Sequence, residues 1–126
     1  MRAVIHTATP STPPVSGPAL EALNNGVVVW FKELTGRGPQ RCQASVCGDH
    51  VLVVLRCVQT PIERTLIDAG RPELVHQLRR TLCDIERDNL SALVSSTIGR
   101  RVQTVLSDHD PASDTTALVF LLERDS

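Results

Sequence analysis

Four arginines close to glycines, at points where the chain is expected to turn, are the first candidates for chemistry in this sequence. They are Arg37, Arg41, Arg100 and Arg101. Guanidinium groups and free backbone N–H groups together could hold a carboxylate, a phosphate or bicarbonate. In the alternative interpretation, the glycines end helices and the arginines are solvated or pair with nearby acids. We favour this alternative because no phosphate-loop motif accompanies the arginines, and we keep the anion site as a hypothesis.

A second cluster of ionisable groups lies near the end of the chain. It consists of Asp108, His109, Asp110 and Asp114. Such groups could bind a hard metal ion, but they lack the ordered oxygen-ligand spacing of a calcium loop. Asp and Pro are also typical of a hairpin connection, so we predict a turn here. The four histidines form no recognised zinc-ligand pair with a nearby Cys or His, and we predict no metal and no cofactor.

No set of residues predicts a catalytic centre. His76 and Cys83 are seven residues apart on an expected helix, which is too far for the direct contact that a nucleophile and its base need. Glu63 is explained by a capping role. The four cysteines, Cys42, Cys47, Cys57 and Cys83, have spacings unlike those of zinc ligands, and we expect reduced thiols that pack in the core. The chain is therefore not expected to be an enzyme.

Composition limits the remaining classes of function. The 126 residues are 41% apolar and 21% charged, as in one ordinary globular domain. A net charge of −1, only three aromatic residues and basic residues interrupted by acids argue against nucleic-acid binding. No apolar run is long enough to cross a membrane, and the start lacks the apolar centre of a signal peptide. We expect a soluble, cytoplasmic protein without direct membrane insertion.

The first half of the chain predicts a helix followed by a hairpin. Residues 1–18 are rich in Thr, Pro and Ser and predict a flexible tail, which leaves residues 19–126 as the single domain. From 19 to 35 apolar residues recur every three or four positions, as on one face of a helix. Two apolar runs, 41–47 and 50–57, then flank Gly48-Asp49, which is a two-residue hairpin signal.

The second half predicts two helices and another hairpin. Thr60, Pro61 and Glu63 form a capping box that opens a short helix ending near Gly70. A longer helix begins near Arg71-Pro72 and ends at Gly99. Its apolar stripe contains Val75, Leu78, Leu82 and Ile85. The phase of the stripe shifts near Asp88-Asn89, which predicts a bend or a break.

Two apolar runs at the end, 102–107 and 116–123, complete a helix–hairpin–two helices–hairpin order. This order predicts an α+β fold with a four-stranded antiparallel or mixed sheet and packed helices. The first hairpin is apolar on both faces, because Leu52 and Val54 lie opposite Val51, Val53 and Leu55. Three helices leave little to cover a second face, so we predict a homodimer or larger assembly, with Leu52 and Val54 in the interface.

Several motifs, taken in order, resemble the MpsC domain family, named for a Na+-translocating membrane-potential-generating system. They are Gly36–Pro39, Gly48-Asp49, Thr60–Glu63, Gly99–Val102, Ser107-Asp108 and Val119–Glu123. The resemblance covers about Leu20 to Glu123. It implies a small soluble protein whose relatives are in some cases encoded beside membrane proteins of cation or inorganic-carbon transport. It provides no catalytic residues.

These observations lead to two hypotheses of function. The first is a noncatalytic interaction or regulatory module that forms a homodimer and has a membrane transport protein as a possible partner. The second is a small-anion or nucleotide-binding sensor that uses the arginines beside the glycines.

Overall fold

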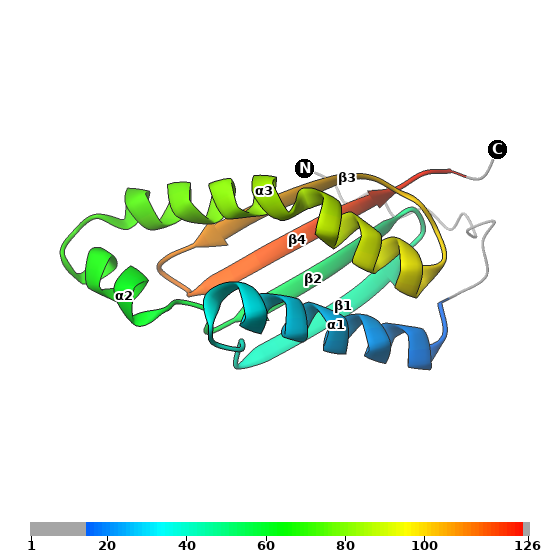
Figure 1. Ribbon diagram of the computed structural model, residues 1–126, viewed down its shortest axis with the longest axis horizontal. Helices are drawn as coiled ribbons and strands as arrows, with labels where there is room; N and C mark the ends of the chain where they lie inside the picture. The colour runs from blue at the N-terminus through cyan, green and yellow to red at the C-terminus, as the bar shows by residue number, and fades with distance from the viewer. Residues whose placement is uncertain (1–14, 125–126) are drawn as a thin grey trace, which may run out of the picture.

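The computed structural model describes residues 15–124, so all but the last four residues of the predicted tail lie outside it. The elements follow in the order α1 Gly17–Thr35, β1 Arg41–Cys47, β2 His50–Arg56, α2 Pro61–Asp68, α3 Pro72–Ile98, β3 Val102–Asp110 and β4 Thr115–Leu122. Figure 1 shows these elements as a layer of helices in front of a sheet. The predicted order and the α+β fold are confirmed.

All four strands form one antiparallel sheet with the order β1-β2-β4-β3. The mixed alternative is therefore excluded within residues 15–124. In the first hairpin Ala44 pairs with Val53 and Val46 pairs with Val51, in the predicted register. The last strand, β4, lies between β2 and β3, so the strand that comes last in the chain is one of the two inner strands. β1 and β3 are the two edges.

One face of the sheet carries the hydrophobic core. Val51, Val53 and Leu55 on β2 are fully buried, as is Phe120 on β4. These side chains pack in one cluster with residues from both long helices, α1 and α3. Both helices therefore lie on the same face of the sheet (Figure 1), rather than one on each face.

The ends of the helices follow from local capping groups. Ser16 Oγ accepts a hydrogen bond from the backbone N–H of Ala19, so α1 begins at Gly17, two residues before the predicted start. Gly36 ends α1 in the left-handed region, at φ 80°, as predicted. Thr60 and Glu63 form the predicted capping box at the start of α2.

The long helix α3 is continuous from Pro72 to Ile98 and ends at Gly99, which also has a φ of 80°. The predicted change near Asp88-Asn89 is thus a bend and not a break, and Figure 1 shows the axis of α3 changing direction over the sheet. No helix within residues 15–124 is both long and apolar enough to cross a membrane.

The predicted apolar stripe of α3 is only partly the buried one. The buried residues in the first half of the helix are Val75, Arg79 and Cys83. Leu78 is 41% exposed and Ile85 is 68% exposed. The prediction that Leu78 and Ile85 lie on the buried face of α3 is therefore wrong. Arg79 faces inward instead, where it forms an ion pair with Glu63.

We predict that substitutions will separate the two sides of α3. Ile85→Lys should change the free energy of unfolding by less than about 0.5 kcal/mol, because the side chain is solvated. Leu90→Ala should lower it by about 2–5 kcal/mol, because Leu90 is fully buried in the core cluster. Urea denaturation of both variants measures the difference. An equal loss in the two variants would contradict the observed rotation of the helix.

Candidate functional site

The four candidate anion-binding arginines lie at opposite ends of the sheet. Arg41 opens β1, and Arg37, just before it, donates from Nη1 to the carbonyl oxygen of Gln59 at 3.1 Å. Arg100 instead donates to the carbonyl oxygen of Gly48 at 2.9 Å, in the turn after β1. The seven residues of β1 separate these ends by roughly 20 Å. The structure does not gather the four guanidinium groups around one pocket.

Arg100 has a clear structural use at its end of the sheet. Its Nη2 donates to Asp49 Oδ1 at 3.0 Å and to the carbonyl oxygen of Glu123 at 3.1 Å. The hydrogen bond from Arg100 is the largest cause that keeps the pKa of Asp49 below its usual range. Arg101, the next residue, is exposed. Arg100 thus joins the first hairpin to the end of β4. Its contact with Asp49 agrees with the alternative interpretation, in which the arginines pair with nearby acids.

The predicted turn at the second hairpin is shorter than expected. Strand β3 continues to Asp110, so only residues 111–114 form the connection. The longer strand turns His109 into the core and leaves Asp108 and Asp110 exposed. Asp114 has a positive φ of 52°, and its Oδ1 accepts from the backbone N–H groups of Val58 and Gln59, both at 2.9 Å. Within residues 15–124, no three His, Cys, Asp or Glu side chains gather as metal ligands.

A buried ion pair joins the two helices of the second half. Arg79 Nε donates to Glu63 Oε2 at 2.6 Å, and Arg79 Nη2 donates to the carbonyl oxygen of Val58 at 2.6 Å. Glu63 Oε1 also accepts from the backbone N–H of Thr60 at 2.9 Å. Burial raises the pKa of Glu63, but hydrogen bonds from Arg79 and Thr60 and the charge of Arg79 outweigh this effect, so the pKa lies below its usual range. The guanidinium carbon is 5.1 Å from the centre of the Phe31 ring.

His109 extends this polar cluster beneath α3. Gln59 Nε2 donates to the carbonyl oxygen of Pro111 at 3.0 Å and lies 3.2 Å from His109 Nε2. Since that amide nitrogen is a donor, His109 Nε2 accepts, and Nδ1 carries the proton that is donated to Thr116 Oγ1 at 2.7 Å. Burial, followed by the charge of Arg79, lowers the pKa of His109. The ring is therefore neutral in the folded protein near neutral pH.

The cluster braces the fold, because the bonds of Arg79 and those of Gln59 involve the consecutive residues Val58 and Gln59 and tie them to α2, α3 and the second hairpin. The sequence predicts a capping box for Glu63 and does not indicate its partner, Arg79. A signal was present, since residues 75, 79 and 83 share one helix face on which the charged residue stands between Val75 and Cys83. What could not be predicted is that α2 folds back beside α3 and brings Glu63 to that face.

The four cysteines are free thiols in different environments. Burial raises the pKa of the Cys42 thiol to about 11, and its Sγ lies 3.7 Å from Asn24 Oδ1. Cys83 is buried, but Cys47 is exposed, so the expectation that the four thiols pack in the core is wrong for Cys47. A high pKa and burial make a thiol a poor nucleophile, so Cys42 is suited to packing rather than catalysis.

The face of the sheet that points away from the helices is the strongest candidate for a functional surface. Leu52, Val119 and Leu106 form one row across β2, β4 and β3. Leu52 is 36% exposed and Leu106 is 55% exposed. Val54 lies in the next row of the same face. We call this surface, with Ala117 and Leu121, the open face.

Charged residues border the open face in an asymmetric pattern. Arg41 on β1 and Asp110 on β3 stand at the two edges of one row across the sheet. Arg56 on β2 is next to Arg41 in this row, and Asp108 on β3 bonds to His76 of α3. A hydrogen bond from His76 is the largest cause that lowers the pKa of Asp108, and one from Ser113 is the largest for Asp110. Both acids are therefore carboxylates at neutral pH. The open face thus has a basic side and an acidic side with an apolar centre.

Comparison with protein families identifies one match that covers most of the chain. The model of the family described as "Na+-translocating membrane potential-generating system (MpsC)" matches residues 17–124. No curated protein and no solved structure gives a significant match. The match spans all seven helices and strands of the structure, from α1 to β4.

We predict that removing one member of the buried ion pair destabilises the protein strongly. Arg79→Met should lower the free energy of unfolding by about 3–5 kcal/mol, because Glu63 is left as an unpaired buried charge. The exposed neighbour provides the control, since Arg80→Met should change it by less than about 0.5 kcal/mol. Urea denaturation provides both values. If the two variants unfold alike, the pair does not support the fold.

We also predict that His109 makes the protein acid-sensitive below about pH 6.5. The folded pKa of His109 is lower than the unfolded pKa, so the unfolded chain takes up a proton first as the pH falls. Below about pH 6.5 this uptake lowers the free energy of unfolding by at most about 1.4 kcal/mol per pH unit. Above that pH the contribution of His109 to stability is fully present. The folded pKa of Glu63 is also lowered, so Glu63 also makes the protein less stable in acid. This loss of stability occurs at a more acidic pH, because an unfolded Glu titrates near pH 4.5.

The measurement is the free energy of unfolding of the wild type, His109→Gln and His50→Gln at several pH values from 5 to 8. His109→Gln should flatten the slope below about pH 6.5 whatever its effect on the absolute stability. His50, which is exposed on β2, serves as the control and its replacement should leave the slope unchanged. A slope that persists in His109→Gln would assign the effect to another group.

Proposed function

We propose, since the chain belongs to the MpsC family, that it is a noncatalytic interaction or regulatory module associated with a membrane cation or inorganic-carbon transport system. In this proposal it acts in the cytoplasm as a homodimer. The link to transport is supported by the family description and by the resemblance of the sequence motifs. The dimer is supported by the open face.

The observation that carries the proposal is the apolar centre of the open face. Leu52, Leu106 and Val119 form a contiguous row, while both long helices pack on the other side of the sheet (Figure 1). Burial of such a surface contributes roughly 25 cal/mol per Å2. Contiguous exposed apolar rows are typical of protein interfaces rather than of solvated surfaces.

The charges at the borders favour a second copy of this chain as the occupant. A twofold axis parallel to the strands, between two facing sheets, sets β1 of one copy against β3 of the other. Arg41 then lies opposite the partner's Asp110, and the same pair forms again on the other side of the axis. The central rows of β2 and β4 face each other at the same time. One arrangement thus satisfies both the apolar centre and the charged borders.

The size of the open face bears on the affinity of the proposed dimer. Four strands about 4.8 Å apart and seven residues long cover roughly 400 Å2 in projection. Stable interfaces bury about 800 Å2 of accessible surface on each partner. The projected area of the open face is about half of that value, which corresponds to a small interface. We therefore expect dissociation in the micromolar range.

The noncatalytic part of the proposal is supported by the use of the buried ionisable groups. Glu63 and Arg79 bond to each other, and His109 is engaged through both ring nitrogens. The alternative of an anion or nucleotide sensor loses support, because Arg41 and Arg100 lie at opposite ends of β1.

We predict that a charge at the centre of the open face dissociates the dimer. Leu52→Lys should weaken self-association at least a hundredfold, because two ammonium groups would be buried near the twofold axis. Light scattering over a micromolar concentration range measures the mass. Ile62→Lys is the control, because Ile62 is also an exposed apolar residue, at 74%, but lies on α2 and outside the open face.

A charge exchange tests the orientation of the two copies. Arg41→Asp should weaken the dimer, and the double variant Arg41→Asp, Asp110→Arg should restore it. The proposal of a face-to-face dimer is wrong if the wild type is a monomer throughout the range. It is equally wrong if the dimer survives Leu52→Lys, since pairing of edge strands would then hold the copies together.

A further inference from the structure

The outer side of the helical layer carries an apolar stripe that the fold does not use. Leu74, Leu78 and Ile85 on α3 are exposed, and Leu82 between them is partly so. These positions recur every three or four residues, which places them on one face of the helix. From Leu74 to Ile85 the stripe is about 16 Å long. A solvent-facing helix needs no such repeat for its own stability.

An open hollow lies between α1 and α3, and two of its lining residues, Trp30 and Leu34, also line a smaller pocket together with Leu82 of the stripe. Its volume is about 730 Å3, and its apolar walls include Val29, Trp30, Leu34 and Leu93. Val29 is 55% exposed. The helices are held closely at one point, where a Cβ on Gly26 would lie 2.7 Å from Leu93 Cδ1. We call the hollow and the stripe together the helical groove.

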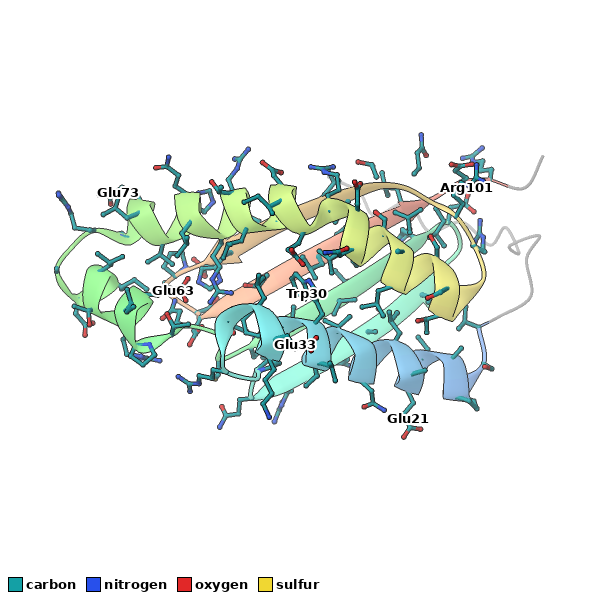
Figure 2. All side chains as sticks on the ribbon, in the orientation of Figure 1. Glu21, Trp30, Glu33, Glu63, Glu73 and Arg101 are labelled. Atoms are coloured by element: carbon teal, nitrogen blue, oxygen red, sulfur yellow. The ribbon has the colours of Figure 1, made fainter. Side chains whose placement is uncertain are left out.

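The charges in the hollow are of one sign. The only charged residues that line it within residues 15–124 are Glu33 and Glu86. Glu86 Oε1 accepts a hydrogen bond from Trp30 Nε1 at 2.8 Å. This bond connects the indole ring on α1 to α3. Glu33 forms no ion pair with another described residue and is exposed. Figure 2 shows Trp30 between α1 and α3, with Glu33 beside it on α1.

We propose that the helical groove binds an amphipathic helix of a partner protein that carries Lys or Arg beside its apolar face. A third helix packs naturally in the furrow between two others, with its apolar residues against Val29 and the α3 stripe. The carboxylates of Glu33 and Glu86 then attract basic residues on the incoming helix and disfavour acidic ones. They also disfavour an anionic lipid surface as the occupant.

The groove is independent of the proposed dimer interface. Its hollow is lined by α1 and α3, which pack on one face of the sheet, whereas the open face is the other face. Figure 1 shows the helices on one side of the sheet only. Segments rich in Lys and Arg commonly flank membrane spans, so a membrane protein could supply such a helix. The proposal does not depend on that source, and the binding partner is defined by its chemistry.

Trp30 makes the groove directly measurable, because it is the only tryptophan of the chain. The probe is an amidated, tryptophan-free peptide of about 14 residues with Leu at helical spacing and Lys elsewhere. Its counterpart has Glu in place of every Lys. We expect a saturable shift of Trp30 emission with the Lys peptide and at least tenfold weaker binding of the Glu peptide.

Two substitutions on α1 provide a matched pair. Glu33→Lys should weaken binding of the Lys peptide about tenfold, because it reverses a charge in the hollow. Glu21→Lys makes the same change on an exposed residue of the same helix outside the hollow, and should have little effect (Figure 2). Leu52→Lys should bind the peptide as the wild type does, whether or not the protein dimerises.

Several outcomes would overturn the proposal. Equal binding of the Lys and Glu peptides would show that the groove does not select charge. Equal weakening by Glu33→Lys and Glu21→Lys would show only an effect of net charge. No saturable change of Trp30 emission with either peptide would remove the site altogether. Loss of the dimer in Val29→Asp would show that a second copy of the chain occupies the groove instead.

Discussion

The carboxylate of Glu63 and the guanidinium of Arg79 meet below the junction of α2 and α3, and the geometry of the second half of the chain follows from this contact. Two charges can be buried together only if their remaining donors and acceptors are satisfied. Here the carbonyl oxygen of Val58 and the backbone N–H of Thr60 complete the set. The pair thus fixes the end of β2, the capped start of α2 and the rotation of α3 with one cluster of bonds.

That rotation has consequences for both surfaces of the helical layer. Because Arg79 faces inward, Val75 and Cys83 accompany it, and Leu78 and Ile85 turn outward. A polar residue in the core thus displaces apolar residues to the surface. The exchange supplies the stripe of the helical groove, whereas the hollow is lined by residues 25–34 of α1 and 86–93 of α3.

The sheet imposes a second asymmetry. Both long helices are needed on one face, because Val51, Val53 and Leu55 must be covered together with the inward residues of β4. Nothing in residues 15–124 packs on the opposite face, although Leu52 and Val54 are apolar there. A sheet covered on one side normally alternates apolar and polar residues. The departure from alternation in β2 and β4 is what distinguishes the open face from an ordinary solvated one.

The sequence by itself determined the local elements, because their signals act over a few residues. Gly36 and Gly99 end helices in the left-handed region, the Thr60 and Glu63 capping box opens α2, and Gly48 sets the first hairpin in register. The continuous apolar run on β2 also predicted a strand that is apolar on both faces, and with it the candidate interface residues. Each of these features needs only backbone preferences and neighbours close in the chain.

Only the tertiary structure decided which long-range partners meet. The arginines looked alike in sequence, but Arg100 ties the first hairpin to the end of β4, and Arg79 is the one that is buried. The inward face of α3 could not be read from apolar spacing, because a charged residue enters the core once a distant carboxylate is there to pair with it. Burial of a charge depends on its partner, and Glu63 lies sixteen residues away on another helix.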